Sequence, residues 1–133
     1  MPDVRPAAVA GMFYPKALSA LTADVRAYLA DAQSGLSAEN VVPKALIAPH
    51  AGYIYSGPIA ASVYARLAAG RETIRRVVLF GPTHRVPVRG LALPSTRAFA
   101  TPLGTVAVDR EAGEIGLAGL PEALRRLRGC IDS

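Results

Sequence analysis

The sequence predicts an α/β fold in which helices pack against a sheet that contains parallel strands. Two short apolar runs, Lys44–Ala48 and Arg76–Phe80, are typical of strands buried on both faces of such a sheet. A helical pattern that begins at Pro58 lies between them, and the crossover from Pro49 to Arg75 has the length of a strand–helix–strand unit. Because such crossovers are right-handed, we expect the two strands to be parallel and to end at the same edge of the sheet.

Length and composition fit a single α/β domain over residues 1–133. The chain is 51% hydrophobic and 19% charged, which excludes a disordered tail. Its one cysteine, Cys130, cannot form an internal disulfide, so a reducing, cytoplasmic location is expected. Cys130 lies near the chain end, where a catalytic thiol would be poorly fixed. No apolar run is long enough to span a membrane, and no signal-peptide pattern is expected at the N-terminus.

The basic residues outnumber the acidic ones, 15 to 10, which gives a net charge of +5. Most of them are arginines, and they are spread along the chain without interleaved aromatic residues or a nucleic-acid-binding motif. An anionic substrate is compatible with this charge, but nucleic acid is not the expected partner.

The first predicted helix covers Pro15–Gln33. Apolar residues recur there at helical spacing, and Pro15 suits a position in the first turn. The second helix is expected to open at Pro58, with Ser56 or Gly57 as its cap, and to stop at Gly70. Shorter strands are predicted over Gly90–Pro94 and Gly104–Val108, and a further helix, interrupted around Gly119–Pro121, over Arg110–Arg128.

The two histidines of the chain, His50 and His84, each lie just beyond the carboxyl end of a predicted strand. Open α/β sheets bind ligands at that edge, so the two imidazoles are expected to share one crevice. Imidazole ligands suit iron, zinc and copper. Without a metal, the pair could act as an acid and a base near neutral pH. A third alternative is that the two are unrelated loop histidines that bond to backbone or water.

Neighbouring residues fit a site at this edge but also have structural explanations. Arg85 could hold a carboxylate or phosphate, or it could lie on a solvated loop. Tyr53 and Tyr55 alternate along the chain, so that one could face the crevice while the other packs. Phe13 could wall a pocket or simply join the core.

Neither of the two histidine-bearing loops contains a carboxylate. No Asp or Glu occurs between Asn40 and Glu72 or between Thr73 and Val108. A third protein ligand for a metal would therefore have to come from elsewhere in the chain or from another polypeptide.

Several motifs together resemble the Memo family, known in prokaryotes as AmmeMemoRadiSam system protein B. The resemblance extends from residue 5 to about residue 110, with the segments in the family's order and spacing. It rests on Gly11-Met12-Phe13-Tyr14-Pro15, Ala48-Pro49-His50-Ala51-Gly52-Tyr53, Tyr55-Ser56-Gly57, Gly81-Pro82-Thr83-His84, Val86-Pro87 and Phe99-Ala100-Thr101-Pro102-Leu103-Gly104.

The resemblance implies a three-layer α/β/α sandwich with a mixed sheet, like that of the LigB-type class III extradiol dioxygenases, which use non-haem iron. It also implies that His50 and His84 match two metal ligands, with Fe(II) expected and copper as the alternative. Phe13 and Tyr55 match residues of the same pocket. The pocket of animal relatives has been assigned both metal-dependent redox chemistry and the binding of phosphotyrosine peptides. The prokaryotic relatives are named for association with a radical-SAM protein and an AMMECR-type protein.

Family members are longer than this chain, which resembles their N-terminal half. Their second half carries an acidic His-Ser motif and the cysteine that completes the metal site, and Cys130 does not match that cysteine. A sheet divided at this point would expose an apolar face or an unpaired edge, which favours homo-oligomers or assembly with another chain.

Three functional hypotheses follow. The leading one is a metal-binding protein with dioxygenase-like ancestry, in which Arg85 or Tyr55 orients the substrate and Phe13 and Tyr53 line the pocket. The first rival is a module that binds a peptide or anionic ligand in the same pocket without turnover. The second is an inactive half-domain.

Overall fold

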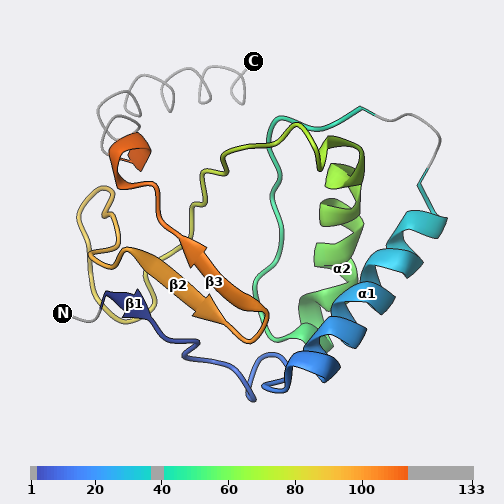
Figure 1. Cartoon of the computed structure of the whole chain (residues 1–133), viewed down its shortest axis with the longest axis horizontal. Helices are drawn as coiled ribbons and strands as arrows, with labels where there is room; N and C mark the ends of the chain where they lie inside the picture. Colours follow the sequence, from blue (N-terminus) through green and yellow to red (C-terminus); the bar gives the residue numbers. More distant parts are fainter. Residues whose placement is uncertain (1–2, 37–40, 114–133) are drawn as a thin grey trace. The chain divides into compact units, whose positions relative to one another are not determined.

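The computed structural model describes residues 3–36 and 41–113, which form two compact units (Figure 1). Of the described residues, 6–36, 41–77 and 100–104 belong to the helical unit, and 3–5, 78–99 and 105–113 belong to the strand unit. The element order is β1 (Val4–Arg5), α1 (Leu18–Ser34), α2 (Tyr53–Tyr64), the 3₁₀ helix η1 (Ala65–Gly70), β2 (Ala98–Thr101) and β3 (Gly104–Ala107).

The α1 helix confirms the first predicted helix to within a few residues at each end. Its apolar positions form a stripe from which Leu21 is buried, with an exposed fraction of 3%. The helix ends before Gly35, whose N–H donates to the carbonyl of Ala32. This bond satisfies one of the carbonyls that a helix leaves unpaired at its C-terminus.

The α2 helix begins earlier than predicted, at Tyr53 rather than at Pro58. Its N-cap is Gly52, and Pro58 lies in the second turn. The early start is stabilised because the N–H of Tyr53 has an acceptor outside the helix, the carbonyl of Phe13 at 2.7 Å. The predicted cap at Ser56 or Gly57 was therefore wrong. The predicted stop at Gly70 is confirmed, since the 3₁₀ helix η1 continues α2 to that residue.

Small residues on one side of α2 face α1, and the two helices run side by side (Figure 1). Gly57, Ala61 and Ala65 are buried on this side of the segment formed by α2 and η1. A Cβ atom at Gly57 would lie 2.9 Å from Cε2 of Tyr28. The close approach of the Tyr28 ring thus requires a residue without a side chain at position 57.

The three strands form a small mixed sheet in the order β1-β2-β3. Val4 and Arg5 of β1 pair in parallel with Ala98 and Phe99 of β2. Only two residues connect β2 to β3, a length that joins antiparallel strands. The strand predicted over Gly104–Val108 is confirmed as β3, and a sheet with accompanying helices is consistent with the α/β class.

Three other predicted strands are absent from the described part of the chain. Lys44–Ala48 and Arg76–Phe80 belong to no strand, and neither does Gly90–Pro94. A strand exists only where a neighbour accepts and donates its backbone hydrogen bonds, and composition alone cannot supply that neighbour. The third segment also opens at Gly90, whose φ of 80° interrupts extended backbone.

The last predicted helix is described only at its start. Residues 110–113 are helical, and the Asp109 side chain caps them by accepting a hydrogen bond from the N–H of Ala112 at 3.0 Å. The rest of the predicted range and Cys130 lie outside the described residues.

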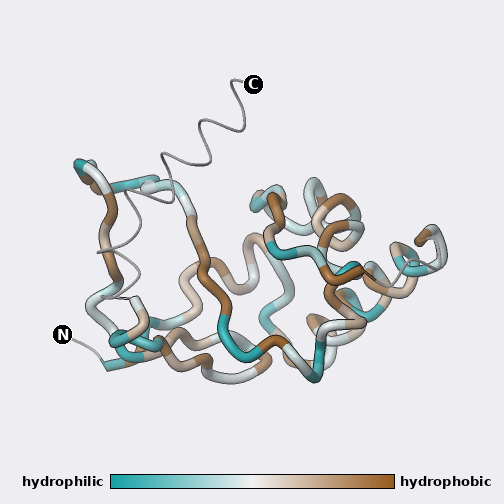
Figure 2. The backbone as a smooth tube through the Cα atoms, turned by 90° about the horizontal axis from the view of Figure 1, so that it is seen from above, coloured by the Kyte–Doolittle hydropathy of each residue, from teal (hydrophilic) through white to brown (hydrophobic). Residues whose placement is uncertain are grey.

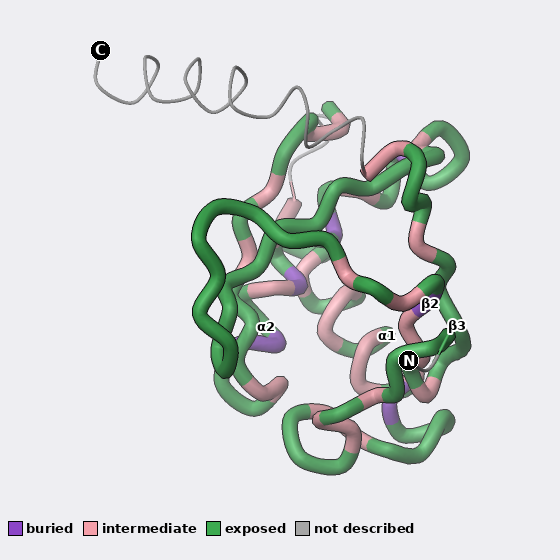
Figure 3. The backbone as a smooth tube through the Cα atoms, turned by 90° about the vertical axis from the view of Figure 1, so that its left-hand side faces the viewer, coloured by how far each residue is buried: buried purple, intermediate pink, exposed green. Residues whose placement is uncertain are grey.

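Large apolar side chains are widely exposed in the described ranges. Ile47 is 95% exposed and Leu79 84% exposed, and no described side chain has an exposed fraction below 2%. Figure 2 shows apolar residues along extended backbone as well as on the helices, and Figure 3 shows buried positions at only a few places. The described residues therefore leave much apolar surface uncovered. None of the described helices is long and apolar enough to cross a membrane.

Candidate functional site

The loop that carries His50 is anchored directly to the start of α2. Gly52 caps the helix, and its carbonyl accepts hydrogen bonds from the N–H groups of Tyr55 and Ser56. The Ser56 hydroxyl, which is buried, donates to the carbonyl of Ala51 at 2.8 Å. These bonds fix the backbone immediately after His50, which is itself exposed.

A tight turn brings Phe13 to the same place. The φ of Gly11 is 85°, a conformation that favours glycine, and its N–H donates to the carbonyl of Tyr14 at 2.8 Å. The turn aims the Phe13 carbonyl at the N–H of Tyr53, as described above. The structure thus joins two of the motifs singled out in the sequence, with His50 three residues before the point of contact.

Tyr53 lies in a cluster of aromatic rings. Its ring centroid is 5.7 Å from that of Tyr14 and 6.1 Å from that of Tyr28, the second pair meeting edge to face. Burial raises the pKa of the Tyr53 phenol above its ordinary value, and neighbouring Tyr14 adds to the effect. This arrangement indicates that Tyr53 packs, whereas Tyr55 is 80% exposed.

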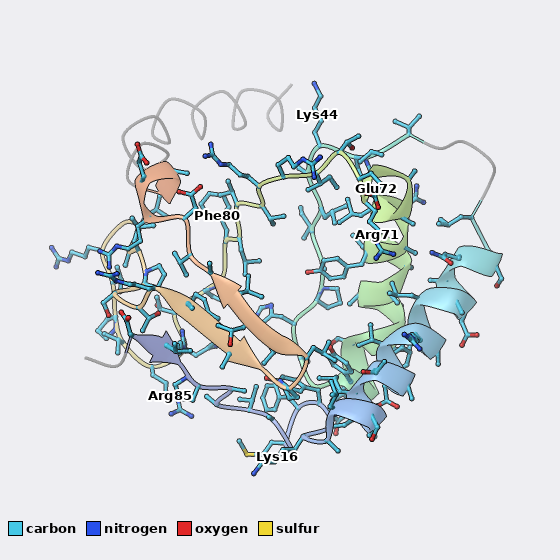
Figure 4. All side chains as sticks on the ribbon, in the orientation of Figure 1. Lys16, Lys44, Arg71, Glu72, Phe80 and Arg85 are labelled. Atoms are coloured by element: carbon cyan, nitrogen blue, oxygen red, sulfur yellow. The ribbon has the colours of Figure 1, made fainter. Side chains whose placement is uncertain are left out.

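His84 and Arg85 belong to the strand unit, where both are exposed. They follow an apolar stretch that includes Phe80, labelled in Figure 4, which is 60% exposed. His50, Phe13, Tyr53 and Tyr55 belong to the helical unit. The crevice shared by His50 and His84 therefore stays a prediction.

The donor chemistry of the two histidines suits a transition metal, but the ligand set is incomplete. Neutral imidazole binds iron and copper well. Within residues 3–36 and 41–113, no group of three or more His, Cys, Asp or Glu side chains is placed to hold a metal ion. The donor chemistry of each histidine suits such an ion, and their pairing as two ligands stays a prediction.

A separate hollow of about 450 Å³ lies within the helical unit. Leu29 and Gln33 of α1, Leu67 of η1 and Ile74 contribute to its lining, and none of the predicted site residues does. Arg71 at its edge forms a long ion pair with Glu72, at 3.9 Å, in the region labelled in Figure 4. Both side chains are largely exposed, so this pair contributes little to stability.

Comparison with known proteins gives the family. A family model described as Memo-like protein matches residues 5–117. The chain belongs to the Memo-like family. The anchored loop of His50 and the turn of Phe13 both lie within the region that defines this membership.

Relatives from bacteria and animals match most of the chain. The MEMO1 family protein of Aquifex aeolicus is 42% identical over 112 residues, which cover 84% of this chain and 39% of that protein. Protein MEMO1 of Danio rerio is 36% identical over 107 residues, covering 80% of this chain and 34% of the relative. The mouse protein MEMO1 is 34% identical over 121 residues, which cover 90% of this chain and 39% of the relative. The chain thus spans about two-fifths of the length of the curated Memo-like relatives it matches.

Sequence reasoning overlooked two contributions to this region of the Memo-like chain. The Ser56 hydroxyl holds the loop after His50, although the sequence suggested only a helix cap. Tyr28 packs against both Tyr53 and Gly57. The helical spacing of Tyr28 with the other apolar residues of α1 signalled that it would be buried, but not what it would contact.

Proposed function

We propose that this Memo-like chain binds a metal ion, iron or copper, through His50 and His84, in a pocket with dioxygenase-like redox chemistry. The observation that carries the proposal is the anchoring of the His50 loop. A ligand loop must be fixed at the backbone if its imidazole is to keep one position. Here three hydrogen bonds fix it: Tyr53 N–H to Phe13, Ser56 Oγ to Ala51, and Ser56 N–H to Gly52.

Residues of this chain would have different roles in the pocket. Bound iron or copper would supply electron-transfer and oxygen chemistry, with coordination positions left open for substrate. Arg85 binds an anionic group of the substrate through its planar guanidinium. Tyr55, which is exposed in the first turn of α2, orients the substrate by a hydrogen bond, and Phe13 and Tyr53 wall the pocket.

The fold proposal that accompanies this function is a three-layer α/β/α sandwich of the LigB type. It is supported by the packing of α1 on α2, which makes one helical layer, and by the mixed sheet. Partners proposed from the family are a radical-SAM protein, an AMMECR-type protein and further copies of the chain.

Metal content is the direct test of the proposal. The protein is purified without oxygen, its iron and copper are measured by elemental mass spectrometry, and the metal-free form is titrated with Fe(II) and Cu. We expect saturable binding in the wild type, weakened more than about tenfold in His50→Ala and His84→Ala because each removes a ligand. Ser62→Ala, on exposed α2 surface, is the matched control and should bind as the wild type does.

Two outcomes would contradict the metal site. Unchanged stoichiometry and affinity in His50→Ala would show that the metal binds elsewhere. Tight binding of an anionic peptide in the presence of a chelator, with no metal uptake in any variant, would favour the module that binds without turnover.

A further inference from the structure

The hollow of about 450 Å³ in the helical unit has the size of a small-molecule site. Ligand pockets in proteins usually enclose about 300–1,000 Å³. Its lining comes from α1, the end of α2, η1 and the residues just after η1, all of which belong to the helical unit. None of the residues assigned to the proposed metal pocket lines it. The hollow is therefore a second candidate site, separate from His50 and His84.

Most of the wall of this hollow is aliphatic. Leu29 of α1, Leu67 of η1 and Ile74 line it and are partly buried. Two further lining residues, Ala65 and Ala68, have small side chains, which leave room for a ligand. A saturated hydrocarbon chain suits such a wall, because its burial there removes apolar surface from water.

Two strongly polar side chains lie toward one end of the hollow. Gln33 is the next-to-last residue of α1, and Arg71 directly follows η1. Because α1 and α2 run in the same direction and η1 continues α2, both residues lie at the carboxyl ends of their segments (Figure 1). The Gln33 amide and the guanidinium of Arg71, labelled in Figure 4, thus form a polar end to an aliphatic hollow.

The chain around this polar end is positively charged. Arg66, Arg71, Arg75 and Arg76 occur within residues 66–76, where Glu72 is the only acidic residue. The side chains of Arg71 and Glu72 are 3.9 Å apart and largely exposed, so Glu72 compensates the charge of Arg71 only weakly. The carboxyl end of a helix carries roughly half a negative charge, which the four arginines exceed. An anionic group is therefore favoured at this end.

We propose that the hollow binds an aliphatic monocarboxylate. The hydrocarbon chain of the ligand packs against Leu29, Leu67 and Ile74, and its carboxylate accepts hydrogen bonds from the guanidinium of Arg71. The amide of Gln33 donates a further hydrogen bond to the same group. The proposal does not depend on metal binding, because neither histidine lines the hollow.

The test is a calorimetric titration of the whole chain with decanoate, at concentrations below those at which it forms micelles. All buffers contain a chelator, so that the state of the proposed metal site does not affect the result. We expect saturable binding of one decanoate per chain. Decyltrimethylammonium, which has the same hydrocarbon chain and the opposite charge, should bind more than about tenfold more weakly.

Two pairs of variants assign the binding to the hollow. Arg71→Gln should weaken decanoate binding more than about tenfold, because it removes the charged donor. Arg66→Gln, in the same segment but outside the lining, is its matched control and should bind as the wild type does. Ala68→Trp fills the hollow and should abolish binding, whereas Ala69→Trp, at the next exposed position and outside the lining, should not. Circular dichroism checks that all four variants keep their helices.

Three results would overturn the proposal. The first is equal affinity for decanoate in Arg71→Gln and Arg66→Gln. The second is uptake of several decanoate molecules that Ala68→Trp leaves unchanged, which would show general binding to exposed apolar side chains. The third is no uptake by a chain that is dimeric and becomes monomeric in Ala68→Trp, in which case a second copy occupies the hollow.

Discussion

Tyr53 joins two distant motifs through its backbone and organises an aromatic cluster through its side chain. Its N–H bonds to Phe13, and its ring packs between those of Tyr14 and Tyr28. The residue therefore contributes to folding as well as to the wall of the proposed pocket. Tyr55, two residues further along α2, makes none of these ring contacts.

Stability should fall at alkaline pH because of Tyr53. Burial raises the pKa of its phenol in the folded state, whereas the unfolded chain loses this proton near pH 10. The contribution of the protonated phenol to the free energy of unfolding is therefore fully present below about pH 10. It is lost as the pH rises through the folded-state pKa. Urea unfolding from about pH 9 upward should show a shallower fall for Tyr53→Phe than for the wild type. Parallel curves for the two proteins would contradict this, and Tyr55→Phe is the control expected to follow the wild type.

At the scale of residues, the sequence predicted which side chains belong to the region of His50 but not their contacts. Phe13 and Tyr53 come together in the helical unit, and His50 precedes Tyr53 by three residues. The hydrogen bond between Tyr53 and Phe13 uses backbone atoms, which every residue has. No residue type in the sequence could therefore predict it. The place of His84 relative to this set depends on packing that local pattern does not encode.

The α1–α2 contact depends on the absence of a side chain at Gly57. In Gly57→Ala, the new methyl group would lie 2.9 Å from the Tyr28 ring, which must move. Overpacking of this kind costs about 1–3 kcal/mol, and the better helix propensity of alanine offsets up to about 1 kcal/mol. We expect a net loss of about 1 kcal/mol in the free energy of unfolding, measured by chemical denaturation.

A double-mutant cycle tests the assigned cause. In a Tyr28→Ala background the same substitution should lose its penalty, because the ring is gone. Gly81→Ala, where a Cβ would meet nothing within 4 Å, should change stability little in either background. An equal penalty at Gly57 with and without Tyr28 would show that the contact is not responsible.

Helices were predictable from this sequence and strands mostly were not. The α1 helix follows from its own periodic residues, because its hydrogen bonds are internal. A strand instead needs a partner elsewhere, so Lys44–Ala48 and Arg76–Phe80 have strand composition without strand structure. The β2 strand was missed because Ala98–Thr101 is short and lacks alternating polarity.

For the molecule as a whole, the exposed apolar residues predict strong binding of the dye ANS. Side chains such as Ile47, Ile54 and Leu79 are more than four-fifths exposed, and ANS fluoresces when it binds such surface. We expect bright fluorescence from the folded chain. The urea-unfolded chain is the dim control. Weak fluorescence from the folded chain alone would show that these side chains are covered in solution.

The hydrogen bond between Phe13 and Tyr53 also has a consequence for the order of folding. It closes a loop of chain that contains the whole of α1. Closing this loop lowers the entropy of the chain before the contact contributes any stability. A helix forms from residues that are close in sequence, so it has no such cost. We expect α1 to form early and the first turn of α2 to form late, after closure. The loop of His50 would then be among the last parts of the helical unit to become ordered.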